Sequence, residues 1–226
     1  MKAFQSNGWK RGSRSKSDKV KALILVDIQH DFLPGGALAV PEGHEVIPIA
    51  NKLQQAFPLV VATQDWHPAD HRSFAANHPG KKVFEQIELN GLPQTLWPVH
   101  CIQHTPGAAL AKSLRQHRIA RVFQKGTDSG IDSYSGLFDN GRRKSIGLGE
   151  WLKYKGIKEV FVCGLATDYC VKFTALDSVH FGFKTNVIED ASRGVNLRPD
   201  DVKSAISEMK HAGVTIIHST HILKAK

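Results

Sequence analysis

The stretch Val160-Phe-Val-Cys-Gly-Leu-Ala-Thr-Asp-Tyr-Cys170 passes from an apolar run through a glycine-bearing turn into an amphipathic segment. The run Val160–Cys163 shows no alternation of polar and apolar residues, which is typical of a strand buried on both faces of a parallel sheet. The segment Asp168–Phe183 has a helical pattern. The stretch therefore predicts a buried strand that leads into a helix, with Cys170 in the first turn of that helix.

Five further apolar runs of this kind occur along the chain. They are Ala22–Val26, Pro58–Ala62, Ile119–Phe123, Thr185–Ile188 and Val214–Ile217. The segments between them that have helical patterns are Gly43–Phe57, Ile146–Lys155 and Pro199–Ala212, with a short helix expected near Gly107–His117. Alternating strands and helices predict an α/β fold with a single domain: a doubly wound, mainly parallel six-stranded sheet with helices on both faces.

The composition excludes several classes of protein. The 226 residues are 41% hydrophobic and 23% charged, which suits a globular domain with a sizeable core. No apolar run is long enough to span a bilayer, and no segment has the pattern of a secretory signal. The three cysteines, Cys101, Cys163 and Cys170, are too irregularly spaced for a disulfide framework. We therefore expect a cytoplasmic protein without membrane association, with Cys101 and Cys163 as inert buried thiols.

The net charge of +9 is concentrated at the N-terminus. Residues 1–21 hold seven basic residues and one acidic residue, whereas the rest of the chain holds 23 basic and 20 acidic residues. A segment rich in Lys, Ser and Gly indicates a solvated, disordered tail. We therefore predict a basic tail over residues 1–20 and a folded domain over residues 21–226. Nucleic acid is disfavoured as a partner, because most of the positive charge lies in the tail.

Polar residues stand at the ends of several predicted strands. Asp27 follows the first apolar run, Asp65 the second and Lys125 the third. The turn Gly164–Cys170 follows the fourth run. Doubly wound sheets bind their ligands outside the carboxyl ends of the strands, so this coincidence predicts a functional site at that edge of the sheet.

Each of these residues also has a purely structural interpretation. Asp27 could cap a following helix, although Asp31 can fill that role and would leave Asp27 free for acid–base chemistry. Lys125 could be a solvated charge at a strand end. Cys170, in contrast, would lie at the positive end of a helix, which lowers the pKa of a thiol and offers unpaired backbone N–H groups to an oxyanion.

A histidine-rich region follows the second predicted strand. It contains Asp65-Trp-His-Pro-Ala-Asp-His71 and Trp97-Pro-Val-His-Cys101. Asp65 and His67 are two residues apart at a strand end, where alternate side chains face the same way. Two imidazoles and one carboxylate with open coordination positions suit Zn²⁺, Fe²⁺ or Mn²⁺. The spacing alone leaves a metal site and an ordinary polar loop equally open, with several candidates for a further ligand: His71, His78, His100 and His104.

Taken together and in this order, the motifs resemble those of the nicotinamidases, which belong to the isochorismatase-like cysteine hydrolases. The resemblance rests on Val26-Asp-Ile-Gln-His-Asp-Phe32, Asp65-Trp-His-Pro68 with Ser73-Phe74, Trp97-Pro-Val-His-Cys101, Lys125-Gly-Thr-Asp128 with Asp132-Ser-Tyr-Ser-Gly-Leu-Phe138, and Gly164-Leu-Ala-Thr-Asp-Tyr-Cys170. It extends from about Lys21 to the C-terminus, and residues 1–20 have no counterpart in the family pattern. Five linked motifs are far more specific than any one of them.

The resemblance implies an isochorismatase-like hydrolase fold and a catalytic triad of Asp27, Lys125 and Cys170. It also implies a cis peptide bond between Leu165 and Ala166. In the family pattern, the N–H groups of Ala166 and Cys170 form an oxyanion hole.

The resemblance further implies one divalent metal ion, Zn, Fe or Mn, held by Asp65, His67 and His100. Some family members use a second histidine after the Asp-x-His pair, and whether His71 is such a ligand stays open. The residues that match the walls of the family's substrate pocket are Phe32, Trp97, Tyr134 and Leu165.

The activity implied is hydrolysis of nicotinamide to nicotinate and ammonia through a covalent thioester, as part of NAD salvage, with pyrazinamide as a second substrate. Two alternatives are another amidohydrolase of the same superfamily and a non-catalytic binding protein on the same fold. Members with other substrates generally lack the Asp-x-His…His set, and retention of Asp27, Lys125 and Cys170 argues against loss of catalysis. The oligomeric state stays open, with a homo-oligomer among the alternatives.

Overall fold

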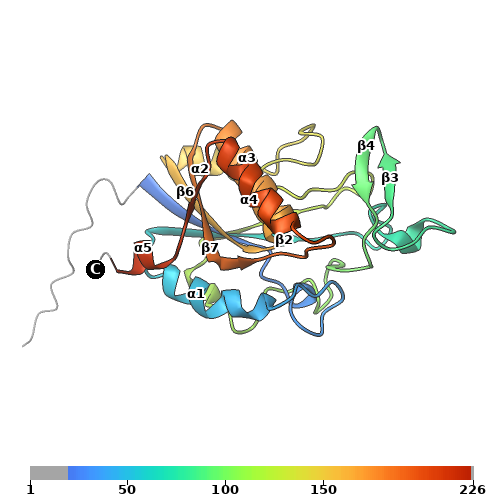
Figure 1. The fold of residues 1–226 in the computed structure, drawn as a ribbon, viewed down its shortest axis with the longest axis horizontal. Coiled ribbons are helices and arrows are strands. Elements are labelled where there is room, and N and C mark those ends of the chain that lie inside the picture. The colour runs from blue at the N-terminus through green and yellow to red at the C-terminus, as the bar shows by residue number, and fades with distance from the viewer. Residues whose placement is uncertain (1–19, 225–226) are drawn as a thin grey trace, which may run out of the picture.

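Six parallel strands form the central sheet of the molecule (Figure 1). They are β1 (Lys21–Val26), β2 (Leu59–Asp65), β5 (Arg121–Lys125), β6 (Glu159–Leu165), β7 (Lys184–Arg193) and β8 (Thr215–Ile217). Their order across the sheet is β5-β2-β1-β6-β7-β8, and every neighbouring pair is parallel. Each strand overlaps one of the six predicted apolar runs, so the predicted doubly wound sheet is confirmed.

The structure is a computed structural model, and it describes residues 20–224. Apart from Val20, the predicted basic tail over residues 1–20 lies outside the described residues. Within residues 20–224, no helix is long and apolar enough to cross a membrane.

Helices cover both faces of the sheet (Figure 1). On one face lie α1 (Val46–Leu53), which follows the 3-10 turn η3 (Gly43–Glu45), and the short α5 (Thr220–Leu223). On the other face lie α2 (Leu148–Tyr154), α3 (Lys172–His180) and α4 (Asp201–His211). Strand alternation explains the two layers, because Leu23 and Leu25 of β1 pack in the core beneath α1. Ile24, between them, packs in the separate core beneath the other three helices.

One predicted helix is absent. The segment 107–117 contains only the start of a 3-10 turn, η5 (Gln116–Arg118). Its backbone instead pairs with the segment after β1: His30 N–H donates to Ala109 C=O, and Ala111 N–H donates to Ile28 C=O. The prediction near Gly107–His117 was therefore wrong, because these tertiary hydrogen bonds replace the bonds of a helix.

A two-stranded antiparallel ribbon, which the sequence analysis did not predict, stands apart from the main sheet (Figure 1). It consists of β3 (Gln86–Leu89) and β4 (Leu92–Thr95). The connecting Asn90 and Gly91 have φ angles of 52° and 80°. Asn-Gly is the preferred pair for a two-residue hairpin turn with positive φ, so a sequence signal for this ribbon was present.

The strand order reverses between β1 and β6, which is the position where doubly wound sheets bind ligands. At this point Gly164, near the end of β6, approaches the end of β1 so closely that a Cβ on it would lie 2.1 Å from the carbonyl oxygen of Val26. Glycine is therefore required there. Asp27, the first residue after β1, has a φ of 47°, so the chain turns sharply away from the sheet at this residue. The carboxyl ends of β1, β2, β5 and β6 thus lie next to one another along one edge of the sheet.

Candidate active site

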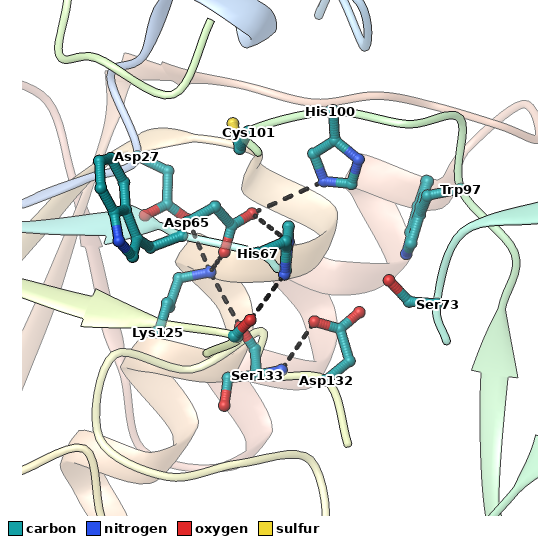
Figure 2. A network of polar contacts seen from close by, with 12 residues as sticks. Asp27, Asp65, His67, Ser73, Trp97, His100, Cys101, Lys125, Asp132 and Ser133 are labelled. Carbon is teal, nitrogen blue, oxygen red and sulfur yellow. Dashed lines mark hydrogen bonds and ion pairs between the residues drawn. The ribbon is translucent and has the colours of Figure 1, made fainter. Parts of the chain in front are cut away.

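Lys125, the last residue of β5, is fully buried at the centre of a polar cluster (Figure 2). Its Nζ lies 2.9 Å from Asp27 Oδ2 and 3.4 Å from Cys170 Sγ. It also donates to the carbonyl oxygen of Ser133 at 2.9 Å and pairs with the carboxylate of Asp65. The three residues assigned to a triad by resemblance therefore lie together, and the lysine contacts both of the others.

Asp27 is held from a second side by Thr63 of β2. The hydroxyl of Thr63 donates to Asp27 Oδ1 at 2.6 Å and accepts the backbone N–H of Asp27 at 3.3 Å. Oxygen atoms of Asp27 and Asp65 and the sulfur of Cys170 all lie within 4.8 Å of one another. The Asp27 carboxylate is thus fixed in orientation beside the thiol.

The two carboxylates beside Lys125 differ in their proton affinity. Burial raises the pKa of Asp27, and the charge of Lys125 only partly opposes this effect. Burial acts in the same direction on Asp65, but Lys125 and His67 outweigh it and hold the pKa of Asp65 well below its usual range. Burial alone would lower the pKa of Lys125, yet Asp27 and Asp65 raise it well above the ordinary value. Opposite shifts in neighbouring carboxylates are typical of an acid–base site.

The environment of Cys170 contradicts one expectation from the sequence. Cys170 lies in a π-helical turn, η6 (Thr167–Val171), which precedes α3. Burial raises the pKa of its thiol well above the ordinary value; Lys125 opposes this effect, whereas Asp27 adds to it. The expected lowering by a helix terminus was wrong, because burial and neighbouring carboxylates dominate. The thiol is therefore neutral at rest and needs a base to become a nucleophile.

A small cavity opens beside Cys170. It is lined by Phe32, Leu38, Asp65, His67, Trp97, His100, Asp132, Tyr134, Ala166, Tyr169, Cys170 and Val195. The indole N–H of Trp97 donates to the hydroxyl of Tyr134 at 3.1 Å, and the rings of Trp97 and Tyr169 meet edge to face with 4.8 Å between their centroids. Aromatic walls with polar groups at one end suit a small flat ring.

Three histidine and aspartate side chains form a buried ligand set at this cavity (Figure 2). Asp65 Oδ2 lies 3.6 Å from His67 Nε2 and 3.8 Å from His100 Nε2. His67 Nδ1 donates to the carbonyl of Gly126 at 2.9 Å, and His100 Nδ1 donates to the carbonyl of Pro98 at 2.8 Å. Because a carbonyl can only accept, Nδ1 carries a hydrogen in each ring, and Nε2 is the atom that faces Asp65. This donor set fits a divalent metal ion.

His71 belongs to a second candidate group, in which His67, His71 and Asp132 each offer an atom within 4.8 Å of the others. Its Nδ1 accepts the backbone N–H of Ser73 at 3.2 Å, and its buried Nε2 has no hydrogen-bond partner. Burial lowers the pKa of His71 to about 4. His71 therefore lies beside the first ligand set as a neutral imidazole.

Three other candidates from the sequence do not line the cavity. Leu165 is buried in the core beneath α1, because the side chain of this last residue of β6 points to that face of the sheet. His78 hydrogen-bonds the carbonyl of Arg72, and His104 packs against the ring of Trp66. Among the described residues, neither histidine belongs to a group that could hold a metal ion.

The Leu165–Ala166 peptide bond is cis, as expected. Residues that the sequence analysis gave no role also contribute to the site: Thr63, Ser133, Asp132, Tyr169 and Val195. Thr63 could have been found, because it stands two residues before Asp65 in the same strand and faces the same side. Val195 had no local signal, because the loop after β7 brings it to the cavity.

Comparison with known proteins agrees with this geometry. The chain matches the isochorismatase domain over residues 21–221. It belongs to the isochorismatase family. It is 52% identical over 200 residues to the nicotinamidase of Escherichia coli (strain K12), covering 87% of this chain and 93% of that protein. The resemblance to nicotinamidases indicated by the motifs is thereby confirmed.

Two solved structures extend the comparison. A nicotinamidase and pyrazinamidase of Acinetobacter baumanii matches with a TM-score of 0.89 and 47% identity, covering 92% of this chain and all of that one (100%). A pyrazinamidase of Pyrococcus horikoshii, solved in complex with zinc, matches with a TM-score of 0.72 and 38% identity, covering 88% of this chain and 99% of that one. The fold is therefore that of the isochorismatase-like hydrolases.

Proposed function

We propose that this protein is a nicotinamidase, which hydrolyses nicotinamide to nicotinate and ammonia through a covalent thioester on Cys170. The observation that carries the proposal is the contact of Lys125 with both Asp27 and Cys170 beside an aromatic cavity. The same cavity contains a ligand set for a divalent metal. The identity to nicotinamidases over most of the chain supports this substrate class.

The first step is formation of the nucleophile. Asp27 takes the proton of Cys170, and its raised pKa makes it a stronger base than an exposed aspartate. Lys125, 3.4 Å from the sulfur, stabilises the thiolate that results. Asp65 stays ionised and balances the charge of Lys125.

The second step is attack of the thiolate on the carboxamide carbon. The backbone N–H groups of Ala166 and Cys170 hold the developing oxyanion, and one such donor is typically worth about 2.7–4 kcal/mol of barrier. Asp27 returns its proton to the nitrogen as the C–N bond breaks, so ammonia leaves. Asp27 then takes a proton from water, whose oxygen attacks the thioester carbon. The C–S bond breaks, Asp27 returns this proton to the sulfur of Cys170, and the acid that forms leaves as nicotinate after losing its own proton to solvent.

We further propose that the divalent metal is zinc, held by Asp65, His67 and His100. The zinc in the Pyrococcus horikoshii pyrazinamidase and the two imidazole donors support this choice. When bound, the ion would supply a Lewis acid at the cavity, a chemistry suited to the ring nitrogen of a pyridine substrate. His67 and His100 are held for this role by their Nδ1 hydrogen bonds to backbone carbonyls.

The cavity walls supply substrate selection. Phe32, Trp97 and Tyr134 enclose a space that suits one flat six-membered ring. Pyrazinamide is nearly isosteric with nicotinamide, so we expect it to be cleaved as well. The cellular role that follows is NAD salvage, in the cytoplasm, where the three buried free thiols would stay reduced. We assign the activity to a hydrolase domain over residues 21–226.

The decisive experiment measures ammonia and nicotinate released from nicotinamide by the purified protein, with and without added zinc. We expect stoichiometric formation of both products. Cys170→Ala should remove this activity and leave the far-UV circular dichroism spectrum unchanged. A zinc-loaded, folded wild-type protein that forms neither product would contradict the proposed activity.

A further inference from the structure

The loop after β1, residues 27–31, sends alternate side chains to three different parts of the site. Asp27 belongs to the proposed triad, whereas the mechanism makes no use of Gln29 or Asp31. Gln29 is fully buried, and its amide contacts the segment that carries Asp65. Asp31 contacts the segment that carries His100. We refer to residues 27–31 as the β1 loop.

The side chain of Gln29 binds the backbone of Asp65 on both of its polar groups. Gln29 Oε1 accepts the N–H of Asp65 at 2.8 Å, and Gln29 Nε2 donates to the carbonyl of Asp65 at 2.8 Å. The same Nε2 donates to the carbonyl of Ala108, also at 2.8 Å. The amide thus has strong partners on both its oxygen and its nitrogen, and all of them are buried.

The course of β1 explains why this amide is needed. The pairing of β1 with β2 ends at Leu25 and Ala62, because the chain turns away at Asp27. On the other side of β2, Trp66 N–H donates to the carbonyl of Lys125, so the polar backbone groups of Asp65 face the side that β1 has left. The amide of Gln29 replaces β1 as the hydrogen-bond partner at this position. It pairs with the backbone N–H and carbonyl of Asp65, which burial would otherwise leave without partners.

Asp31 fixes the second ligand segment in a similar way. Its Oδ2 accepts the backbone N–H of Cys101, the residue after His100, at 2.7 Å. Cys101 has a φ of 47°, so the chain bends sharply directly after the histidine. A Cβ on Gly107 would lie 2.3 Å from the Asp31 carboxylate, which shows how closely the backbone encloses this group.

We infer that Gln29 and Asp31 are positioning residues for the metal centre: Gln29 sets the place of Asp65, and Asp31 sets the place of His100. Neither side chain belongs to the ligand set itself. The inference rests on the proposed metal site. Loss of a residue that orients a metal ligand typically weakens metal binding roughly 10–100-fold, and we expect that range for each.

The first test compares two buried glutamines. Gln29→Met keeps the length of the side chain but removes its hydrogen bonds to Asp65. Gln54→Met is the matched control, because Gln54 is equally buried and its side chain, within residues 20–224, hydrogen-bonds Asn51 of α1 and no part of the proposed site. Metal-free proteins are titrated with zinc in competition with a chromophoric chelator, and the absorption spectrum of the cobalt form is recorded. We expect Gln29→Met to bind zinc roughly 10–100-fold more weakly and to alter the cobalt spectrum, and Gln54→Met to match wild type.

The second test uses a conservative pair at Asp31. Asp31→Asn keeps an oxygen that can accept the N–H of Cys101, whereas Asp31→Leu keeps the shape and removes the acceptor. We expect zinc affinity near wild type for the first variant and a loss for the second. This pair decides the question on its own if Gln29→Met does not fold, because Asp31 is partly exposed and its replacement is milder.

The outcomes separate this inference from the proposed function. Folded Gln29→Met and Asp31→Leu proteins that bind zinc as tightly as wild type would overturn the positioning roles and leave the proposed activity untouched. A merely structural role would lower the melting temperature of the metal-free variants without weakening zinc binding, which also overturns the inference. A wild-type protein that binds no zinc would instead contradict the proposed metal site on which the inference rests.

Discussion

Replacing Asp27 by asparagine separates the role of a base from the role of a negative charge. The amide keeps an oxygen that can accept the hydroxyl of Thr63, a bond of 2.6 Å in the wild-type protein. It keeps nearly the same volume in a fully buried position. What it loses is the ability to take the proton of Cys170 and the charge that pairs with Lys125.

The two losses have opposite effects on the thiol. The charge of Asp27 contributes to the raised pKa of Cys170, so its removal should lower that pKa and make the thiolate easier to form. Turnover should nevertheless fall, because no group remains to carry the proton to ammonia. General acid–base catalysis typically contributes 10²–10⁴-fold, which corresponds to about 2.7–5.4 kcal/mol at 1.36 kcal/mol for each tenfold change.

Two measurements on the same preparation test this reasoning. Ammonia release from nicotinamide gives turnover, and the pH dependence of Cys170 alkylation by a small electrophile, followed by mass spectrometry, gives the thiol pKa. Asp177→Asn is the control, because Asp177 is a buried carboxylate on α3 that pairs with Arg142 and not with Lys125. Turnover of Asp27→Asn within about tenfold of wild type would remove Asp27 from the role of base. A raised thiol pKa would refute the electrostatic argument.

Four further outcomes are expected. Cys170→Ala should abolish turnover and still bind zinc, whereas Cys163→Ala should stay active and lose stability through a small cavity, measured by urea unfolding. His67→Ala and His100→Ala should each lose bound zinc in elemental analysis, and dialysis against a chelator should remove the activity of wild type, with readdition restoring it. Burial raises the pKa of Cys163 to about 12 from 9.0. The neutral thiol therefore contributes its full stabilisation below pH 9, and this contribution is lost as the pH rises towards 12. Between these pH values the free energy of unfolding of wild type should fall by up to about 4 kcal/mol more than that of Cys163→Ala. The zinc-loaded enzyme should cleave benzamide, which lacks the ring nitrogen, far more slowly than nicotinamide, and equal rates would contradict the ring-nitrogen contact.

The central sheet could be predicted because its strands are buried on both faces, so each one appears as an unbroken apolar run. The ribbon β3–β4 lacks this signal, because residues of Gln86–Leu89 alternate between exposed and more buried positions and Pro93 interrupts the second strand. The prediction of a helix over residues 107–117 was wrong for a different reason. Its helical pattern is local, whereas its hydrogen bonds are made with the β1 loop, which is far away in the sequence.

The convergence of Asp27, Asp65 and Lys125 could also be expected from the sequence, because the carboxyl ends of parallel strands meet at one edge. The properties of these groups could not. The position of Cys170 at the start of a helix indicated a lowered pKa, yet burial and the nearby carboxylates raise it. The position of a residue in a helix can be recognised from its neighbours in the sequence. The groups that bury and surround this thiol with charge lie in or directly after β1, β2 and β5, which are distant in the chain.

Lys125 explains how two similar carboxylates come to have different roles. Both Asp27 and Asp65 pair with its ammonium group, and burial favours the protonated form of each. Asp65 also faces His67, which adds to the effect of Lys125 and keeps this carboxylate ionised, as a metal ligand requires. Asp27 has no such second cation: burial and the charge of Asp65 raise its pKa, and the hydrogen bond from Thr63 opposes them only in part, so Asp27 can accept a proton. The division between metal ligand and base therefore follows from the second neighbour of each carboxylate, which only the folded chain supplies.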